Sequence, residues 1–219
     1  MKRPGPLLTL LAGLLLGVFL LSLNATKGTK STSAETRKES PTPTVSPTTA
    51  TPSASPSPSP SRTPVPDASY AGRTDDDSSA VALTLRDGKA IAYFCDGRNK
   101  ESWLKGDVTD DGTMKLTGKD GSVLNGTLRE GERIRGTVDI DGGHYAFTAD
   151  RAKKPSGLYR ATATVRGAKV DGGWIVLTGG RQVGILNRDG TPSPAPMIDP
   201  ETGAVTVDGQ QLTARPALP

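Results

Sequence analysis

The sequence predicts an all-β fold: an antiparallel meander of about eight strands that closes into a small barrel or sandwich, with a C-terminal hairpin extension. Two observations predict it. Beyond Asp67, apolar and polar residues alternate in short runs, which is the pattern of half-buried strands. Pairs such as Asp-Gly and Gly-Gly separate these runs, and their glycines supply the positive φ that tight hairpins require. No helical periodicity appears outside the N-terminal segment.

The N-terminal segment, residues 1–25, contains the uncharged apolar run Leu7–Leu23 behind a short basic start. As a helix this run would be about 25 Å long, which just crosses a bilayer. We expect a single transmembrane helix, acting as a signal-anchor, or else a cleaved signal peptide. Lipoprotein attachment would need a Cys directly after the run, and the only Cys is Cys95.

Residues 26–67 are rich in Ser, Thr and Pro, with nine of the 18 prolines between Pro41 and Pro66. Such a segment cannot bury enough apolar surface to offset the entropy of ordering it. We therefore expect a disordered linker. The exported character of this stalk predicts a single-pass protein of the cell membrane with residues 26–219 outside, or a secreted protein if the first segment is cleaved.

Residues 68–188 are expected to form the extracytoplasmic β-domain. The aromatic residues of the β-domain and its regular turns indicate that this part of the chain folds. The turns divide the first part of the domain into eight strands. These are Tyr70–Thr74, Val81–Arg86, Lys89–Cys95, Ser102–Val108, Thr113–Thr117, Ser122–Leu128, Arg133–Asp139 and His144–Ala149.

Three of these strands share an apolar-x-Gly-x-apolar pattern. The triplets are Leu104-x-Gly106-x-Val108, Leu124-x-Gly126-x-Leu128 and Ile134-x-Gly136-x-Val138. Since strand side chains alternate, each triplet faces inward. A mid-strand glycine permits the sharp coiling of a small barrel and leaves room for a large side chain opposite. Tyr93, Tyr145 and Phe147 are the candidates to fill that room.

After Pro155 we expect a strand over Leu158–Val165, and then a hairpin formed by Trp174–Thr178 and Arg181–Asn187. The start of this hairpin is apolar on both faces, which predicts a strand covered by the barrel on one side and by the tail on the other. That tail, residues 189–219, is rich in Gly and Pro and is expected to pack on the domain, with a small hairpin at Asp208-Gly209.

Charge is concentrated in the N-terminal part. Residues 1–66 carry seven Lys and Arg against two acids, whereas the remainder carries 20 against 21. The sequence pI of about 9.2 therefore does not describe the β-domain, which is close to neutral. A nucleic-acid-binding domain needs a basic patch, so we predict no nucleic-acid partner.

The single Cys and single His exclude an intramolecular disulfide and a Cys/His zinc cage. Cys95 shares a strand face with Ile91 and Tyr93, which we expect to point inward, so a buried thiol is the first interpretation. An intermolecular disulfide and a reactive nucleophile are the alternatives. His144 should face outward, and no local motif joins it to Cys95 as a catalytic dyad.

Two Asp-rich stretches suggest calcium sites, Asp75–Asp77 and Asp107–Gly112. The second fails the EF-hand pattern, since Gly118 stands where the bidentate Glu should be. We interpret both as solvated turns and expect no metal, no cofactor and no catalytic residue. Trp103 is placed on the outer face of its strand, where it is either covered by the tail or exposed as a recognition residue.

A short basic start, a leucine-rich anchor, a Ser/Thr/Pro stalk and a β-domain with a Gly/Pro-rich tail follow one another along the chain. This organisation resembles that of membrane-anchored exported proteins of actinobacteria, a resemblance that implies location and no activity. The strand count is also similar to that of lipocalin and streptavidin barrels, without their motifs.

We therefore predict a non-enzymatic, membrane-tethered extracytoplasmic β-domain that binds a protein or a cell-envelope component. Two other classes stay open. A small-ligand-binding β-barrel would have an open cavity beside its central glycines. A Cys-dependent hydrolase would need Cys95 exposed beside His144.

Overall fold

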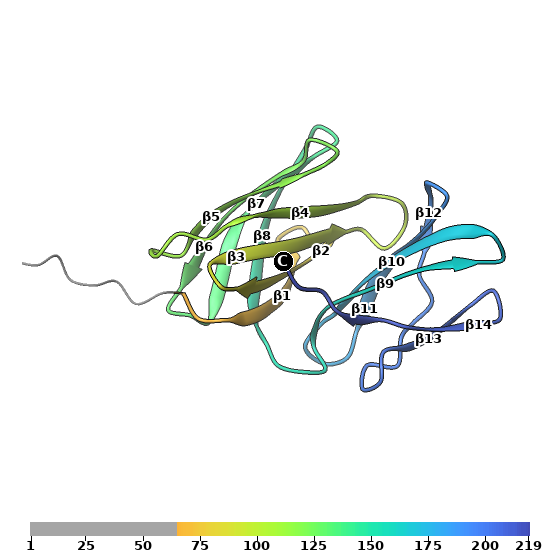
Figure 1. The fold of residues 1–219 in the computed structure, drawn as a ribbon. Helices are drawn as coiled ribbons and strands as arrows, with labels where there is room; N and C mark the ends of the chain where they lie inside the picture. The colour runs from red at the N-terminus through yellow and green to blue at the C-terminus, as the bar shows by residue number, and fades with distance from the viewer. Residues whose placement is uncertain (1–64) are drawn as a thin grey trace, which may run out of the picture. The chain divides into compact units, whose positions relative to one another are not determined.

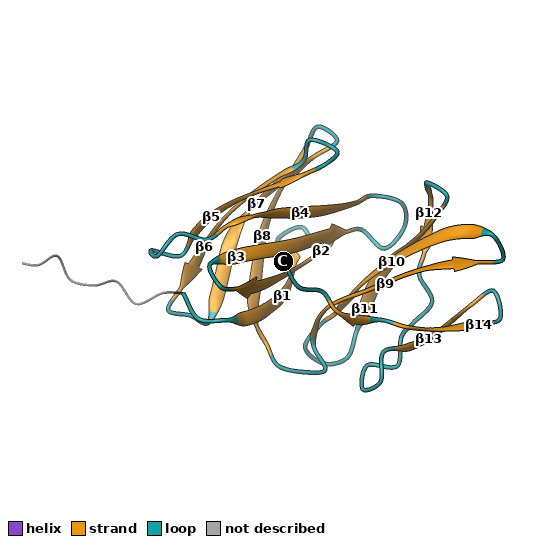
Figure 2. Ribbon diagram, viewed as in Figure 1, coloured by secondary structure: helices purple, strands orange, loops and turns teal. Residues whose placement is uncertain are grey.

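The computed structural model describes residues 65–219, which consist of strands and connecting loops (Figure 2). The predicted anchor at residues 1–25 and the linker up to residue 64 lie outside the described residues. Within 65–219, no helix has the length and apolar character needed to cross a bilayer.

Eight antiparallel strands form a closed barrel in which each strand pairs with the next and β1 also pairs with β8 (Figure 1). They are β1 (Ala68–Thr74), β2 (Ala80–Arg86), β3 (Lys89–Cys95), β4 (Glu101–Asp107), β5 (Thr113–Gly118), β6 (Val123–Arg129), β7 (Arg133–Ile140) and β8 (Gly143–Ala152). The eight predicted strands agree with these bounds to within three residues. The reason is local: at the β2–β3 turn, Asp87 and Gly88 have φ of 50° and 71°, as a two-residue hairpin requires.

Side chains fill the interior of the barrel. The largest are Tyr70, Phe94, Phe147, Leu83, Leu104, Leu116, Leu124 and Ile134. The predicted role of the central glycines is confirmed at Gly136. A Cβ there would lie 2.1 Å from the carbonyl oxygen of Asn125 and 3.0 Å from the ring of Phe147. Tyr145 packs against the same cluster, half-buried.

The chain then builds a second, open sheet in the order β12-β11-β10-β9-β15, followed on its far face by a two-stranded hairpin. The strands are β9 (Gly157–Val165), β10 (Ala168–Val176), β11 (Gln182–Arg188), β12 (Thr191–Pro194), β13 (Ala204–Val207), β14 (Gln210–Thr213) and β15 (Arg215–Pro216). The predicted hairpin at Asp208-Gly209 is confirmed, joining β13 to β14. The observed β10 begins at Ala168, earlier than the predicted start at Trp174. The prediction missed the first half of this strand because that half is polar on one face.

The double-sided burial predicted for the apolar run of β10 is confirmed. Ile175 and Leu177 pack against the barrel. Trp174 and Val176 pack on the opposite face, with Ile198 and the β13–β14 hairpin.

The outer surface of β1, β2 and β3 is buried beneath the second sheet, and this corrects one prediction. Ile91, Tyr93 and Cys95 were expected inside the barrel, but they lie on its outside, against Leu158, Ile175 and Ile185. Because β3 is apolar on both faces, alternation alone does not show which face points inward. Tyr93 therefore does not fill the room beside the barrel glycines.

Candidate functional site

The face of the second sheet that meets the barrel changes from apolar to polar along its strands. Where it lies under the barrel, it presents Leu158 and Ile175. Further along, two cross-strand rows follow, Thr162–Asp171–Asn187 and Thr164–Lys169–Asp189. These two rows line a hollow of about 600 Å³. The sheet thus continues past the barrel as a polar floor.

An aromatic stack marks the boundary between the apolar and the polar part. The rings of Tyr93 and Trp103 are stacked with their centroids 4.3 Å apart, and the guanidinium carbon of Arg160 lies 4.4 Å from the Trp103 ring centroid. The rings rest on Gly173 of β10, where a Cβ would lie 2.5 Å from Tyr93. A glycine is needed here because the two sheets approach so closely.

Trp103 lies on the outer face of the barrel, as predicted. Its ring contacts Arg160 of β9 and Gly173 of β10, and the hydrophobic cluster against which it packs includes Ala217 of the C-terminal tail. The ring is half-buried and engaged by side chains of the protein itself. Its role in recognition stays a prediction, and its visible role is to hold Arg160 in place.

A hydrogen-bonded network joins this stack to the floor of the hollow. The Tyr93 hydroxyl donates to Glu101 Oε2 at 2.5 Å, and Asn187 also bonds to Glu101. Burial raises the pKa of Glu101, and these hydrogen bonds offset part of that rise. Arg160 donates to both carboxylate oxygens of Asp171, at 2.8 and 2.5 Å. Asp171 and Asn187 are therefore held rigidly.

One edge of the second sheet has unpaired main-chain groups. β10 covers the whole length of β9, whereas β15 covers its other side only at Tyr159 and Arg160. The N–H of Asp189 bonds to the carbonyl of Lys169, so the odd-numbered residues of β10 bond to β11 and the even-numbered ones to β9. By the same alternation, Thr162 and Thr164 direct their N–H and C=O away from β10. Within residues 65–219 these groups have no main-chain partner.

The path of the C-terminal chain explains why this edge is open. β15 lies beside β9, but the preceding strand β14 pairs with β13 instead. The change occurs at Ala214, whose N–H bonds to the carbonyl of Gly203. The opposite edge of the sheet, β12, carries Pro192 and Pro194, which lack the N–H that a further strand would need. Of the two edges of this sheet, as described within residues 65–219, only the β9 edge offers a run of donors and acceptors.

Cys95 and His144, the single residues of their kinds, lie in different surroundings. Cys95 is fully buried under the second sheet, and burial raises the pKa of its thiol to about 12. The reactive thiolate is therefore scarce at neutral pH. The side chain of His144 is 66% exposed, as predicted, and lies 2.5 Å from Asp139.

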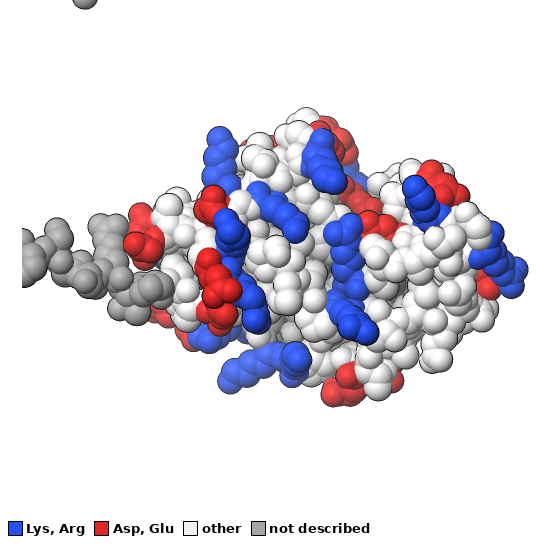
Figure 3. All heavy atoms as spheres, viewed as in Figure 1, with Lys and Arg blue, Asp and Glu red and all other residues white. Residues whose placement is uncertain are grey.

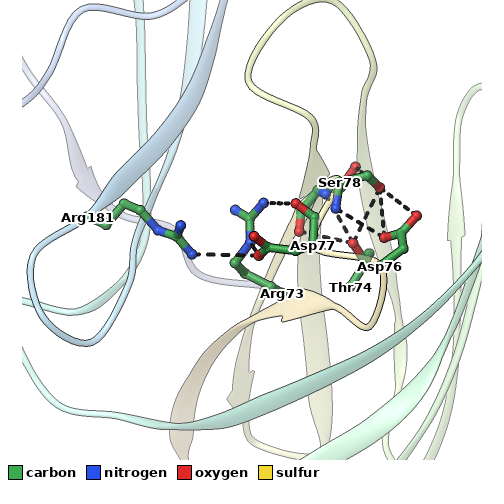
Figure 4. A network of polar contacts seen from close by, with 7 residues as sticks. Arg73, Thr74, Asp76, Asp77, Ser78 and Arg181 are labelled. Carbon is green, nitrogen blue, oxygen red and sulfur yellow. Dashed lines mark hydrogen bonds and ion pairs between the residues drawn. The ribbon is translucent and has the colours of Figure 1, made fainter.

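The Asp75–Asp77 stretch forms the exposed β1–β2 loop, where Figure 4 shows a polar network. Asp76 accepts a hydrogen bond from the Ser78 hydroxyl at 2.8 Å, and Asp77 pairs with Arg73. Arg181, from the β10–β11 turn, reaches the same Asp77 at 3.8 Å. The loop thus links the barrel to the second sheet. In the part of the chain that the structure describes, no three His, Cys, Asp or Glu side chains are grouped to hold a metal ion.

The open edge was missed by the sequence reasoning, although a signal exists. Residues 161–165 are small or β-branched, uncharged and free of proline, unlike the proline-containing segment 191–196.

Comparison with protein-family models, curated proteins and solved structures finds no match to this chain.

Proposed function

We propose that this protein is a non-enzymatic binding module, tethered outside the cell by its N-terminal segment, that captures an extended segment of an envelope protein by strand addition to β9. The open β9 edge carries this proposal. A partner strand would satisfy the outward N–H and C=O groups of Thr162 and Thr164, and such main-chain bonds give affinity in strand addition. Native proteins otherwise cover or guard edges of this kind.

The hollow beside the edge supplies specificity. Alternate side chains of an added strand fall on the face that carries Lys169 and Asp189. Lys169 has no side-chain partner among the described residues, and Asp189 uses one carboxylate oxygen for the Lys169 N–H. Polar or charged side chains at every second position of the partner fit this floor best.

The network behind the floor favours tight binding because it is already ordered. Arg160 is held by Asp171 and lies over Trp103, so this side of the hollow loses little conformational entropy when a partner arrives.

A peptide-display selection on the purified full-length chain tests the proposal. Thr162→Pro removes an N–H that makes no bond to β10, so it should abolish the enrichment of peptides while leaving the fold intact. Thr162→Val keeps that N–H and serves as the matched control, which should still enrich them. Failure of the native chain to enrich any peptide, or equal enrichment by the proline variant, would reject strand addition.

A photo-crosslinking residue at position 164 in intact cells tests the same site with its natural partner. We expect a peptide adduct that disappears in the Thr162→Pro background. The same residue at position 193, on the proline-containing edge, should give none. Adducts of equal yield at both positions would contradict the role of the β9 edge.

A further inference from the structure

Four arginines line a hollow of about 760 Å³ on the barrel, away from the strands that meet the second sheet: Arg129, Arg133, Arg135 and Arg151. Arg129 and Arg133 are directly opposite each other on β6 and β7, and Arg135 follows on the same face of β7, opposite Thr127. Side chains opposite each other in this way have Cβ atoms about 5 Å apart. Three guanidinium groups thus project from one small area.

Only part of this positive charge is neutralised. Arg133 pairs with Asp150 at 2.5 Å, and Arg151 pairs with Glu132 at 3.1 Å. Among residues 65–219, Arg129 and Arg135 make no ion pair or side-chain hydrogen bond. The third acid of the hollow, Glu130 on the β6–β7 turn, is exposed and leaves an excess of positive charge.

This arrangement opposes folding. Like charges placed directly opposite each other on neighbouring strands are destabilising, as at Arg129 and Arg133. Figure 3 shows a face of the molecule on which basic and acidic side chains are interspersed. A ligand that brings negative charge between Arg129 and Arg135 would convert the repulsion into attraction.

We propose that this hollow binds a phosphoryl group. The planar guanidinium donates paired hydrogen bonds to two oxygens of a tetrahedral oxyanion, and the exposed positions of Arg129 and Arg135 let both do so. The Thr127 hydroxyl, which has no partner among the described residues, lies in the same hollow as a further donor. Two neighbouring phosphoryl units of a phosphate polymer, each with one negative charge, match the two free guanidiniums, whereas a single carboxylate carries one charge.

The surroundings favour a phosphate-bearing polymer over a membrane surface. Beyond the hollow, other turns at this end of the barrel carry the exposed carboxylates Asp87 and Asp110. A bilayer of anionic lipids pressed against this end would meet these carboxylates as well as the arginines. A linear polymer can enter the hollow and avoid them.

Binding of linear polyphosphate to the full-length chain in neutral detergent tests this site. Arg129→Gln combined with Arg135→Gln should weaken binding at least about tenfold, because each lost bond joins two charged groups. The matched control, Arg98→Gln with Lys119→Gln, removes the same charge from exposed positions elsewhere. We expect it to weaken binding less than about threefold through the general field alone. All four substitutions are at surface positions, and melting temperatures no lower than that of the native chain would show that both variants fold.

Two further arms distinguish the sources of the phosphoryl group. Inorganic phosphate should compete with polyphosphate, and phosphatidylglycerol vesicles should bind the native chain and the arginine variant alike. No polyphosphate binding by the native chain, equal weakening in both double variants, or arginine-dependent binding to the vesicles alone would overturn the proposal. None of these measurements involves β9, so the site can fail without affecting the strand-addition proposal.

Discussion

The barrel and the second sheet are built from similar antiparallel strands, but they differ in what they leave unpaired. In the barrel, β8 returns to β1, so the sheet has no edge, and side chains fill the interior. The second sheet is open, with one edge that carries prolines and one that is covered by β15 only at its beginning. The unpaired main-chain groups thus lie at an edge of the second sheet, whereas closure of the barrel leaves its sheet without an edge.

The two regions nevertheless share one buried layer. Small residues of β1 and β2 on the outside of the barrel, such as Ala71 and Ala82, pack with Leu158 and Ile175 of the sheet. Separating the barrel from the sheet would expose the apolar side chains of this layer to water, which is unfavourable. We therefore expect the barrel and the sheet to unfold together.

The largest expected effect comes from Trp174→Ala. Trp174 is buried on the far face of the sheet, and its indole N–H donates to the carbonyl of Pro196 at 2.7 Å. Removing it should lower the free energy of unfolding by about 3–5 kcal/mol in urea denaturation. Phe147→Ala, inside the barrel, is the matched variant and should cost a similar amount. Both should show one transition, and a second transition in Trp174→Ala alone would show that the sheet unfolds independently.

The next effect concerns the contact between the two regions. Gly173→Ala places a Cβ against the Tyr93 and Trp103 rings, at 2.5 and 2.8 Å, and should destabilise the protein by about 1–3 kcal/mol. Gly126→Ala inside the barrel meets side chains no closer than 3.3 Å, so it should cost less than about 1 kcal/mol. Trp103 fluorescence should change only in the first variant. Equal costs would mean that the ring stack yields more easily than its distances imply.

The sequence predicted the barrel well because its signals are local. Hairpin turns such as Asp87-Gly88 and the alternation within each strand locate the elements without knowledge of distant contacts. The packing of the Trp174 strand on the barrel was predicted, but the barrel strands that it covers were not, because that contact joins parts of the chain that are far apart in sequence. A usable signal was present: β3 and the run Trp174–Leu177 are both apolar on both faces, and the structure packs them together.

The candidate site was harder to predict for a similar reason. Trp103 was assigned to the correct face, but its partners Arg160 and Gly173 come from β9 and β10. The open edge of β9 depends on where the C-terminal chain turns away at Ala214, which is a property of tertiary structure. The uncharged, proline-free run at residues 161–165 permits an open edge, but a strand paired on both sides has the same pattern.

A smaller effect tests the network that joins the regions. Burial raises the pKa of Glu101 in the folded state, so the stability contributed by its protonated form is present below its ordinary pKa of 4.5 and is lost as the pH rises through the higher folded-state pKa. Glu101→Gln removes this titration. The variant should gain stability relative to the native chain above pH 4.5, by at most about 1.4 kcal/mol per pH unit. A constant difference from pH 4 to pH 8 in urea denaturation would contradict the raised pKa.

The smallest effect returns to the barrel surface, where Arg129 faces Arg133 across β6 and β7. Removing one member of a like-charged pair relieves repulsion, so Arg129→Gln should raise the free energy of unfolding by about 0.2–1 kcal/mol at low salt. Because these side chains are exposed, the gain should vanish near 1 M salt, where the Debye length is about 3 Å. Arg98 lies in the β3–β4 loop and has no basic residue directly across a strand pair, so Arg98→Gln should leave stability unchanged. If Arg129→Gln destabilises the protein, then Arg129 makes a favourable contact and is not held free for a ligand.

If the gain in stability appears, the closed barrel carries positive charge that no acid neutralises, whereas the second sheet carries unpaired main-chain groups. Polyphosphate should then raise the melting temperature of the native chain more than that of the variant, since only the native chain has the repulsion to relieve.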